Sequence, residues 1–179
     1  MRWIAKFIFE NILGWKIVGE LDKNIKKSIL VIAPHTSWYD FYIGALARKI
    51  IKQDINYVAK KELFDSIFGW YFRWMGGAPI DRSKSQNTVD QIVEIFNTRN
   101  EFRLAITPEG TRKKVNQWKT GFYYIAEKAN VPIIPIAFNY KLKQIQIKKA
   151  FVVNGKIEKE LPELKRKFDG IVGRIPENS

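Results

Sequence analysis

Histidine is the side chain whose ordinary pKa lies nearest to neutral pH, and this chain contains only one, His35. His35 directly follows an apolar run, and an aspartate, Asp40, lies five residues further on. A carboxylate that holds one imidazole nitrogen leaves the other free to accept a proton, as in the His–Asp half of a serine-protease triad. His35 is therefore a candidate general base, with Asp40 as the group that orients it.

The spacing of this pair also has a structural interpretation. Ser37 and Asp40 have the separation of a capping box, in which a serine caps a helix and an acid bonds back to the helix start. Asp40 is then a capping residue and His35 an ordinary loop residue. Five residues on one continuous helix would turn the two side chains apart, so a His–Asp contact requires His35 in a loop and Asp40 in the first helical turn. The two interpretations are compatible, because one carboxylate can serve both ends.

Two further clusters could bind an anion. The segment 109–112 follows a buried strand, and its glycine, Gly110, permits a tight turn that exposes backbone N–H groups. Arg112 in that segment and Arg82 after another apolar run each offer a planar guanidinium suited to phosphate. The alternative for these residues, and for Lys61 at a helix start, is a solvated charge on a polar loop.

Apolar runs alternate with segments of helical period along the whole chain. We expect strands at 29–33, 55–59, 78–80, 102–107, 133–139 and 145–153, and helices at 38–51, 62–75, 86–97 and 120–130. This alternation predicts an α/β sandwich, a mostly parallel central sheet flanked by helices with an antiparallel edge from the last two runs. Residues 1–179 are expected to form one domain, with 157–179 as a peripheral charged tail. Since ligands collect at the carboxyl ends of parallel strands, the polar clusters should meet at one edge.

The chain is strongly basic, with 31 lysines and arginines against 18 acidic residues and a net charge of +13. That surplus predicts an acidic partner, such as nucleic acid, anionic lipid, a phosphorylated substrate or an acidic carrier protein. Six tryptophans favour lipid, because the indole ring prefers membrane interfaces. A basic nucleic-acid-binding module is the alternative, but it gives no reason for the His–Asp pair. The absence of cysteines and the single histidine make a metal site unexpected.

Two segments are expected at a membrane surface. Residues 1–18 read as an amphipathic helix suited to the interface plane, with packing on the protein's own core as an equal alternative. Residues 62–75 are apolar on almost every side, which favours partial lipid contact over complete burial. No run reaches the roughly 20 apolar residues that span a bilayer. We therefore expect a peripheral or monotopic protein at the cytoplasmic face of the cell membrane.

Four segments, in order, resemble the motifs of the glycerophospholipid acyltransferases, in particular the lysophosphatidic-acid-acyltransferase-like group. His35 to Asp40 looks like the catalytic H-x-x-x-x-D motif, and Glu109 to Arg112 looks like the E-G-T-R motif. The segment from Lys61 to Arg82 is similar to the second motif, and Val131 to Pro135 to the fourth. The resemblance covers more than half of the chain. It assigns acceptor binding to Lys61, Arg82, Glu109, Gly110, Thr111 and Arg112.

The resemblance implies transfer of a fatty acyl group from acyl carrier protein or coenzyme A to a lysophospholipid hydroxyl, as in 1-acylglycerol-3-phosphate. Another lysolipid is the alternative acceptor, and no cofactor is implied. His35, oriented by Asp40, would remove the hydroxyl proton as the oxygen attacks the thioester. Ser37 is a second candidate, as an acylated nucleophile, but its cap position directs the hydroxyl to backbone N–H groups. Glu109 is expected to orient the acceptor or Arg112.

Overall fold

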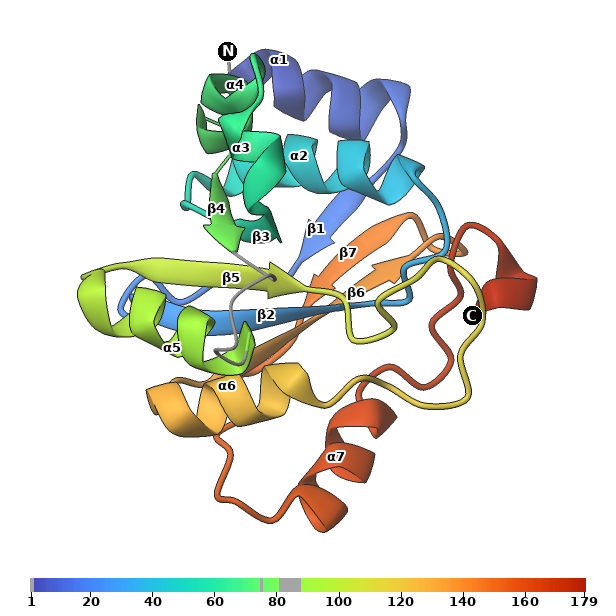
Figure 1. Ribbon diagram of the computed structural model, residues 1–179. Helices are drawn as coiled ribbons and strands as arrows, with labels where there is room; N and C mark the ends of the chain where they lie inside the picture. The colour runs from blue at the N-terminus through green and yellow to red at the C-terminus, as the bar shows by residue number, and fades with distance from the viewer. Residues whose placement is uncertain (1, 75, 81–87) are drawn as a thin grey trace.

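The apolar run before His35 forms β2 (Lys27–Ala33), the strand around which the main sheet is built. The computed structural model describes residues 2–74, 76–80 and 88–179, and within them the main sheet has the strand order β1–β7–β6–β2–β5. Its other strands are β1 (Lys16–Val18), β5 (Phe102–Ile106), β6 (Ile133–Asn139) and β7 (Gln144–Ile147). Strands β5, β2 and β6 are parallel, and β7 runs antiparallel to β6 (Figure 1). The predicted mostly parallel sheet with an antiparallel edge is confirmed.

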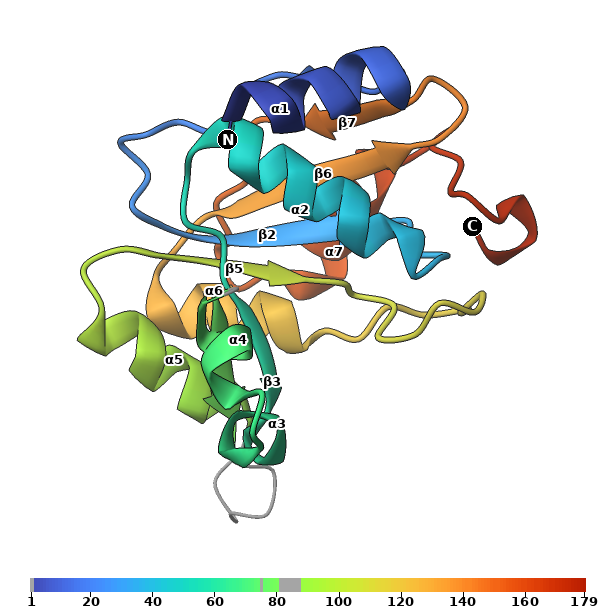
Figure 2. The ribbon, with the colours of Figure 1, turned by 90° about the horizontal axis from the view of Figure 1, so that it is seen from above.

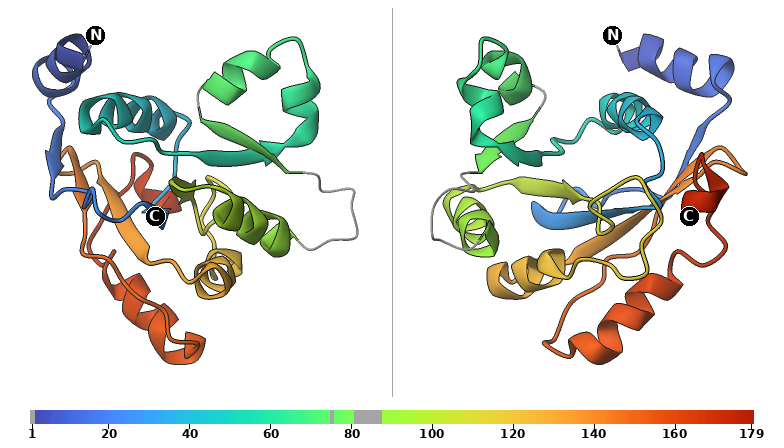
Figure 3. Two further views of the ribbon diagram at one scale, coloured as in Figure 1. Left: turned by 90° about the vertical axis from the view of Figure 1, so that its left-hand side faces the viewer. Right: turned by 45° about the vertical axis from the view of Figure 1, so that its right-hand side comes forward.

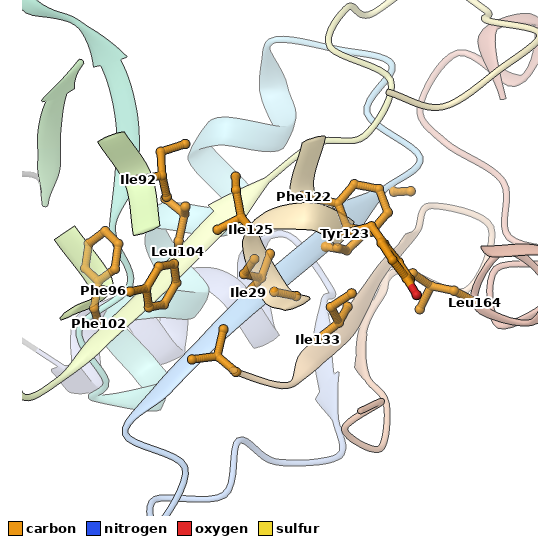
Figure 4. Close-up of a cluster of buried hydrophobic side chains, with 14 of the residues drawn as sticks. Ile29, Ile92, Phe96, Phe102, Leu104, Phe122, Tyr123, Ile125, Ile133 and Leu164 are labelled. Atoms are coloured by element: carbon orange, nitrogen blue, oxygen red, sulfur yellow. The ribbon is translucent and has the colours of Figure 1, made fainter. Parts of the chain in front are cut away.

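Both faces of β2 are buried, which explains why the strand is continuously apolar. Ile29 and Val31 belong to the core cluster on one face, shown in Figure 4, and Leu30 belongs to the cluster on the other. The helices that cover the first face are α5 (Thr88–Thr98), α6 (Gly121–Ala129) and α7 (Ile157–Arg166). Helices α1 (Arg2–Phe7) and α2 (Tyr39–Ile51) cover the other face, as the edge-on views of Figure 3 show.

The predicted helix over 62–75 is two short helices, α3 (Lys61–Asp65) and α4 (Gly69–Trp74). The chain turns back between them so tightly that a Cβ atom on Gly69 would lie 1.9 Å from the carbonyl oxygen of Phe64. Apolar residues on both short helices gave the segment the appearance of one continuous helix.

Helices α3 and α4 connect two parallel strands, β3 (Tyr57–Lys60) and β4 (Gly77–Ile80), which form a separate small sheet. This sheet adjoins β5 through Asn56, whose backbone N–H donates to Arg103 O at 2.7 Å. The unit projects from the β5 edge of the main sheet (Figure 2). The strands expected at 55–59 and 78–80 therefore exist, but they do not lie within the main sheet.

The N-terminal segment combines the two alternatives considered for it. The helix does not reach residue 18: α1 continues as a wider helical turn over Ile8–Ile12, Gly14 takes a left-handed conformation (φ 71°), and β1 follows. Phe9 is completely buried in the core beneath α2, whereas Trp3 and Phe7 are exposed. One face of the segment thus packs on the protein and the other presents apolar side chains to the surroundings.

The prediction of a peripheral tail at 157–179 is wrong, because α7 contributes to the core. Its apolar residues recur at helical spacing, and they pack in the cluster that lies beneath β2: Ile157, Leu161, Leu164 and Phe168. Buried Glu160 accepts a hydrogen bond from the Tyr123 hydroxyl at 2.7 Å and another from Asn154 N. The many charged residues between the apolar ones concealed this stripe.

Candidate active site

The loop from β2 to α2 is wrapped around the Asp40 carboxylate, which is 4% exposed. Oδ2 of Asp40 accepts hydrogen bonds from Thr36 N and Ser37 N, both at 3.0 Å, and lies 2.9 Å from His35 Nδ1. Helix α2 begins at Tyr39, so His35 precedes the helix and Asp40 lies in its first turn. The register required for a His–Asp contact is confirmed, and Asp40 serves the helix start and the imidazole together.

The carboxylate is held in its ionised form by these contacts. Burial alone would raise the pKa of Asp40, but hydrogen bonds from His35, Tyr140 and the Ser37 backbone outweigh it and leave the pKa below its ordinary value. A carboxylate is only an acceptor, so the proton between the two groups belongs to Nδ1 of His35. The other ring nitrogen, Nε2, is then free of a proton in the neutral imidazole and able to act as a base.

Tyr140 is part of this site and no sequence signal pointed to it. It follows β6, and its hydroxyl donates a hydrogen bond to Oδ1 of Asp40, the oxygen that the loop does not use. Burial, followed by the hydrogen bond to Asp40, raises the pKa of the Tyr140 hydroxyl. The phenol therefore remains a proton donor to the carboxylate throughout the neutral range.

Glu109 ties the E-G-T-R segment to the catalytic loop. Its Oε2 accepts a hydrogen bond from the backbone N–H of His35 at 2.8 Å. Burial raises the pKa of Glu109, and the hydrogen bond from His35 opposes that rise. Sequence reasoning expected Glu109 to orient the acceptor or Arg112. The structure instead gives it a contact with the backbone of the candidate base, 74 residues away in the chain.

Beside His35 the same segment forms an open, polar pocket of about 420 Å³. Gly110 takes a left-handed conformation (φ 65°) at its turn, and Lys119 N donates to Pro108 O at 2.8 Å to close the loop. The pocket is lined by His35, Thr107, Gly110, Thr111, Arg112 and Lys113. Arg112 is exposed and makes no ion pair with any residue that the structure describes. Its guanidinium is therefore available to an anionic ligand in this pocket.

A second cavity, of about 370 Å³ and mainly apolar, leads away from His35 beneath α2. At one end it is lined by His35, Asp40 and Arg112, and at the other by Ile51, Ile55 and Tyr57. Its walls are residues of α2 and of β2, β6 and β7, which include Leu30, Gly44, Phe138 and Ile147. The polar pocket and the apolar cavity share His35, Thr107 and Arg112, so they meet at the candidate base.

Of the remaining predicted binding residues, Lys61 is not part of this arrangement. Lys61 begins α3, and Figures 1 and 2 both show α3 well apart from the loop that leads into α2. Neither cavity described above includes Lys61 in its lining. Arg82 lies outside the described residues. Among residues 2–74, 76–80 and 88–179, no group of three or more histidine or acidic side chains is arranged to hold a metal ion.

Helices α3 and α4 expose an apolar surface, which we call the aromatic surface. It consists of Leu63, Ile67, Phe68, Trp70, Tyr71 and Trp74, all at least 40% exposed. It lies on the side of the main sheet that carries α1 and α2, and Lys49 of α2 lies 5.7 Å from the Trp74 ring centre (Figure 3). In the described part of the chain, no helix has the length and hydropathy required to cross a bilayer.

Comparisons with known proteins give matches in sequence and in fold. A family model described as Acyltransferase matches residues 16–139, which include the His35 loop and the E-G-T-R segment. A 1-acyl-sn-glycerol-3-phosphate acyltransferase of Streptococcus pneumoniae is 35% identical over 136 residues, covering 71% of this chain and 50% of that protein. A protein with the same name from Saccharomyces cerevisiae is 28% identical and covers 75% of this chain and 48% of its own length. The chain thus spans about half of the length of these two relatives.

A solved structure shows the same fold. The crystal structure of a 1-acyl-sn-glycerophosphate acyltransferase from Thermotoga maritima superposes with a TM-score of 0.62 at 21% sequence identity. The match covers 93% of this chain and 74% of that one. The mixed α/β architecture, with its mostly parallel sheet between helical layers, is therefore shared with a protein of known structure.

Proposed function

The chain belongs to the acyltransferase family, and from this premise we propose that it transfers a fatty acyl group from a thioester to the hydroxyl of a lysophospholipid such as 1-acylglycerol-3-phosphate. The observation that supports this proposal is the position of His35, where a polar pocket lined by the exposed Arg112 meets an apolar cavity. The polar pocket suits a phosphate headgroup, and the apolar cavity suits a hydrocarbon chain. The curated relatives from Streptococcus pneumoniae and Saccharomyces cerevisiae carry the name of this activity.

In the proposed reaction, Nε2 of His35 accepts the proton of the acceptor hydroxyl as its oxygen attacks the thioester carbonyl carbon. The new C–O bond forms, the C–S bond breaks, and the thiolate takes the proton from His35. Asp40 keeps the imidazole oriented and compensates the positive charge that it gains. General-base assistance of this kind is worth about 10²–10⁴-fold in rate.

Direct attack by the acceptor is preferred to a covalent intermediate on Ser37. The Ser37 side chain is buried, and its Oγ accepts a hydrogen bond from Tyr39 N at 3.2 Å. That oxygen therefore bonds the first N–H group of α2, although Trp38, and not the predicted Ser37, is the residue that caps the helix. A thiolate is a good leaving group, so the reaction does not need an acylated serine.

The proposed donor is a thioester of acyl carrier protein or of coenzyme A. Both are anionic, and Lys113, Lys114 and Lys119 are exposed on the loop that forms the polar pocket. No cofactor or metal ion is part of the proposed reaction.

We propose that the protein acts at the surface of an anionic membrane, on its cytoplasmic face, without spanning it. Trp70 and Trp74 of the aromatic surface are 69% and 66% exposed, and Trp3 and Phe7 of α1 are also exposed on the same side of the sheet. Indole rings partition to the headgroup region, and the net charge of +13 favours anionic lipid. This placement would let a lysolipid acceptor reach His35 without leaving the bilayer surface.

The reaction is tested by offering a panel of lysolipids with palmitoyl-coenzyme A or palmitoyl-acyl carrier protein and identifying products by mass spectrometry. We expect a diacyl product from an acceptor with a phosphate headgroup. Arg112→Ala should raise the KM for that acceptor by about tenfold, because it removes a charge-assisted hydrogen bond. Lys23→Ala, which removes an equal charge from the exposed β1–β2 connection, is the matched control. No product from any combination would overturn the proposed function.

Membrane association is tested by sedimentation with vesicles of phosphatidylcholine and phosphatidylglycerol. Replacing Trp70 and Trp74 together by serine should weaken binding by about tenfold or more, because burying one large apolar side chain is worth about 1.5–3 kcal/mol. Val152→Ser removes an apolar side chain that is 64% exposed between β7 and α7, and it should leave binding unchanged. Equal binding by the double variant and the wild type would contradict a role for the aromatic surface.

A further inference from the structure

Two segments that are far apart in the sequence donate hydrogen bonds to the Asp40 carboxylate. Oδ2 faces the loop and takes its donors from His35, Thr36 and Ser37. Oδ1 faces the opposite way and accepts the hydroxyl of Tyr140, 100 residues further along the chain. In the described part of the chain, Tyr140 is the only hydrogen-bond donor to Oδ1.

Tyr140 is itself fixed by the core and by the C-terminal segment. Its ring packs edge-on against Trp15, with ring centres 4.7 Å apart. Its backbone N–H donates to Val172 O at 2.9 Å. The hydroxyl that holds Asp40 is therefore placed by an aromatic contact on one side and a main-chain contact on the other.

The C-terminal segment continues from Val172 to the catalytic loop itself. Ile175 N donates to Thr36 Oγ1 at 3.1 Å, and the Arg174 guanidinium lies 4.0 Å from the ring centre of Tyr39. Gly173 lies so close to the loop that a Cβ atom would be 2.6 Å from Thr36 Oγ1. Figure 1 shows this segment, in red, beside the loop that leads from β2 into α2.

We propose that Tyr140 is a positioning residue for the His35–Asp40 pair, and that segment 172–175 holds Tyr140 and the catalytic loop in register. The hydroxyl fixes the rotation of the Asp40 carboxylate, so that Oδ2 stays directed at Nδ1 of His35. Loss of the hydroxyl frees Oδ1 and lets the carboxylate turn. The imidazole then loses its preference for the Nδ1–H form, in which Nε2 is available as a base. This role in catalysis rests on the proposed acyl transfer, whereas the effect on the His35 proton does not.

The test compares the wild type with Tyr140→Phe, which removes only the hydroxyl. Because His35 is the only histidine, its imidazole ¹⁵N signals report the proton position without assignment ambiguity. We expect the Nδ1–H form in the wild type and a mixture of both forms in the variant. We further expect kcat to fall about 10- to 100-fold, with KM for the acceptor changed by less than about twofold, because the carboxylate loses a hydrogen bond.

Tyr123→Phe is the matched control, because Tyr123 also donates to a buried carboxylate, Glu160, but on the other face of the sheet. It should lower thermal stability without changing kcat or the His35 signals. Gly173→Ala tests the C-terminal segment, since the added methyl group must push it away from Thr36. It should move the His35 signals and kcat in the same direction as Tyr140→Phe.

The outcomes separate the two proposals. Unchanged His35 signals and unchanged kcat in folded Tyr140→Phe would overturn the positioning role. Wild-type behaviour of Gly173→Ala would overturn the part played by segment 172–175. An altered proton position in Tyr140→Phe, in a protein whose wild type transfers no acyl group to any acceptor, would support the positioning role and refute the proposed function.

Discussion

Filling the apolar cavity beneath α2 should change which acyl chains the protein accepts. Gly44 lies on α2 and lines this cavity of about 370 Å³. A Cβ atom at this position would meet only the Phe138 ring, at 3.6 Å and 4.0 Å, which are ordinary contact distances. A side chain at position 44 can therefore enter the cavity without displacing the helix or the sheet. Gly44→Leu is the variant that follows from this geometry.

The leucine side chain takes the space of about four methylene groups, each worth about 0.8 kcal/mol when buried. A long acyl chain that occupies the cavity should thus lose about 3 kcal/mol, which is on the order of 100-fold in kcat/KM. A chain shorter by about four carbons should lose little. Gly44→Ala should lose about fourfold on the long chain, and its helix should be more stable by about 1 kcal/mol.

The assay is a competition between thioesters of different chain length, with the products resolved by mass spectrometry. Gly121→Leu is the control, because nothing lies within 4 Å of a Cβ atom built there. It should keep the wild-type preference. If folded Gly44→Leu transfers long and short chains in the wild-type ratio, the apolar cavity does not hold the acyl chain during the reaction.

Three further results are expected. Tyr123→Phe should lower the free energy of unfolding by about 1–3 kcal/mol in urea titrations, because the hydroxyl donates to buried Glu160. An unchanged unfolding midpoint would show that this hydrogen bond contributes nothing to stability. Burial raises the pKa of Glu160, but hydrogen bonds from Asn154 and Tyr123 outweigh it and hold the pKa below its ordinary value. The contribution of Glu160 to stability is therefore complete above its unfolded pKa and is lost as the pH falls through the lower folded pKa. Glu160→Gln should make the free energy of unfolding fall less steeply at acidic pH. An equally steep fall in the variant would refute this assignment. Gly110→Ala should raise the KM for the acceptor several-fold at little cost in melting temperature. A left-handed alanine costs about 1 kcal/mol, and the loop relaxes locally to relieve it. Wild-type kinetics would show that the turn at the pocket is dispensable.

The parts of the site that the sequence predicts are those set by local geometry. An apolar run followed by a capping-box spacing places His35 before a helix and Asp40 in its first turn. Two buried parallel strands, β2 and β5, then bring the E-G-T-R segment beside His35, because the carboxyl ends of such strands share an edge. The fold class follows from the same alternation of apolar runs and helical segments.

The parts that were missed depend on contacts between distant segments. Tyr140 reaches Asp40 from the end of β6, and the predicted site residue Glu109 accepts a hydrogen bond from the backbone of His35, so no local spacing reveals either contact. The turn between α3 and α4 depends on the close approach of Gly69 to the Phe64 carbonyl. The apolar stripe of α7 is visible in the sequence at helical spacing. The charged residues around it led instead to the prediction of a peripheral tail.

In the proposed reaction, Nε2 of His35 accepts the hydroxyl proton during acyl transfer. The most direct measurement is the turnover of radiolabelled acyl thioester by His35→Ala, with folding of the variant checked by its urea unfolding curve. The rate is expected to fall at least about 100-fold while the unfolding midpoint stays close to that of the wild type. Wild-type turnover by a folded His35→Ala protein would contradict the claim.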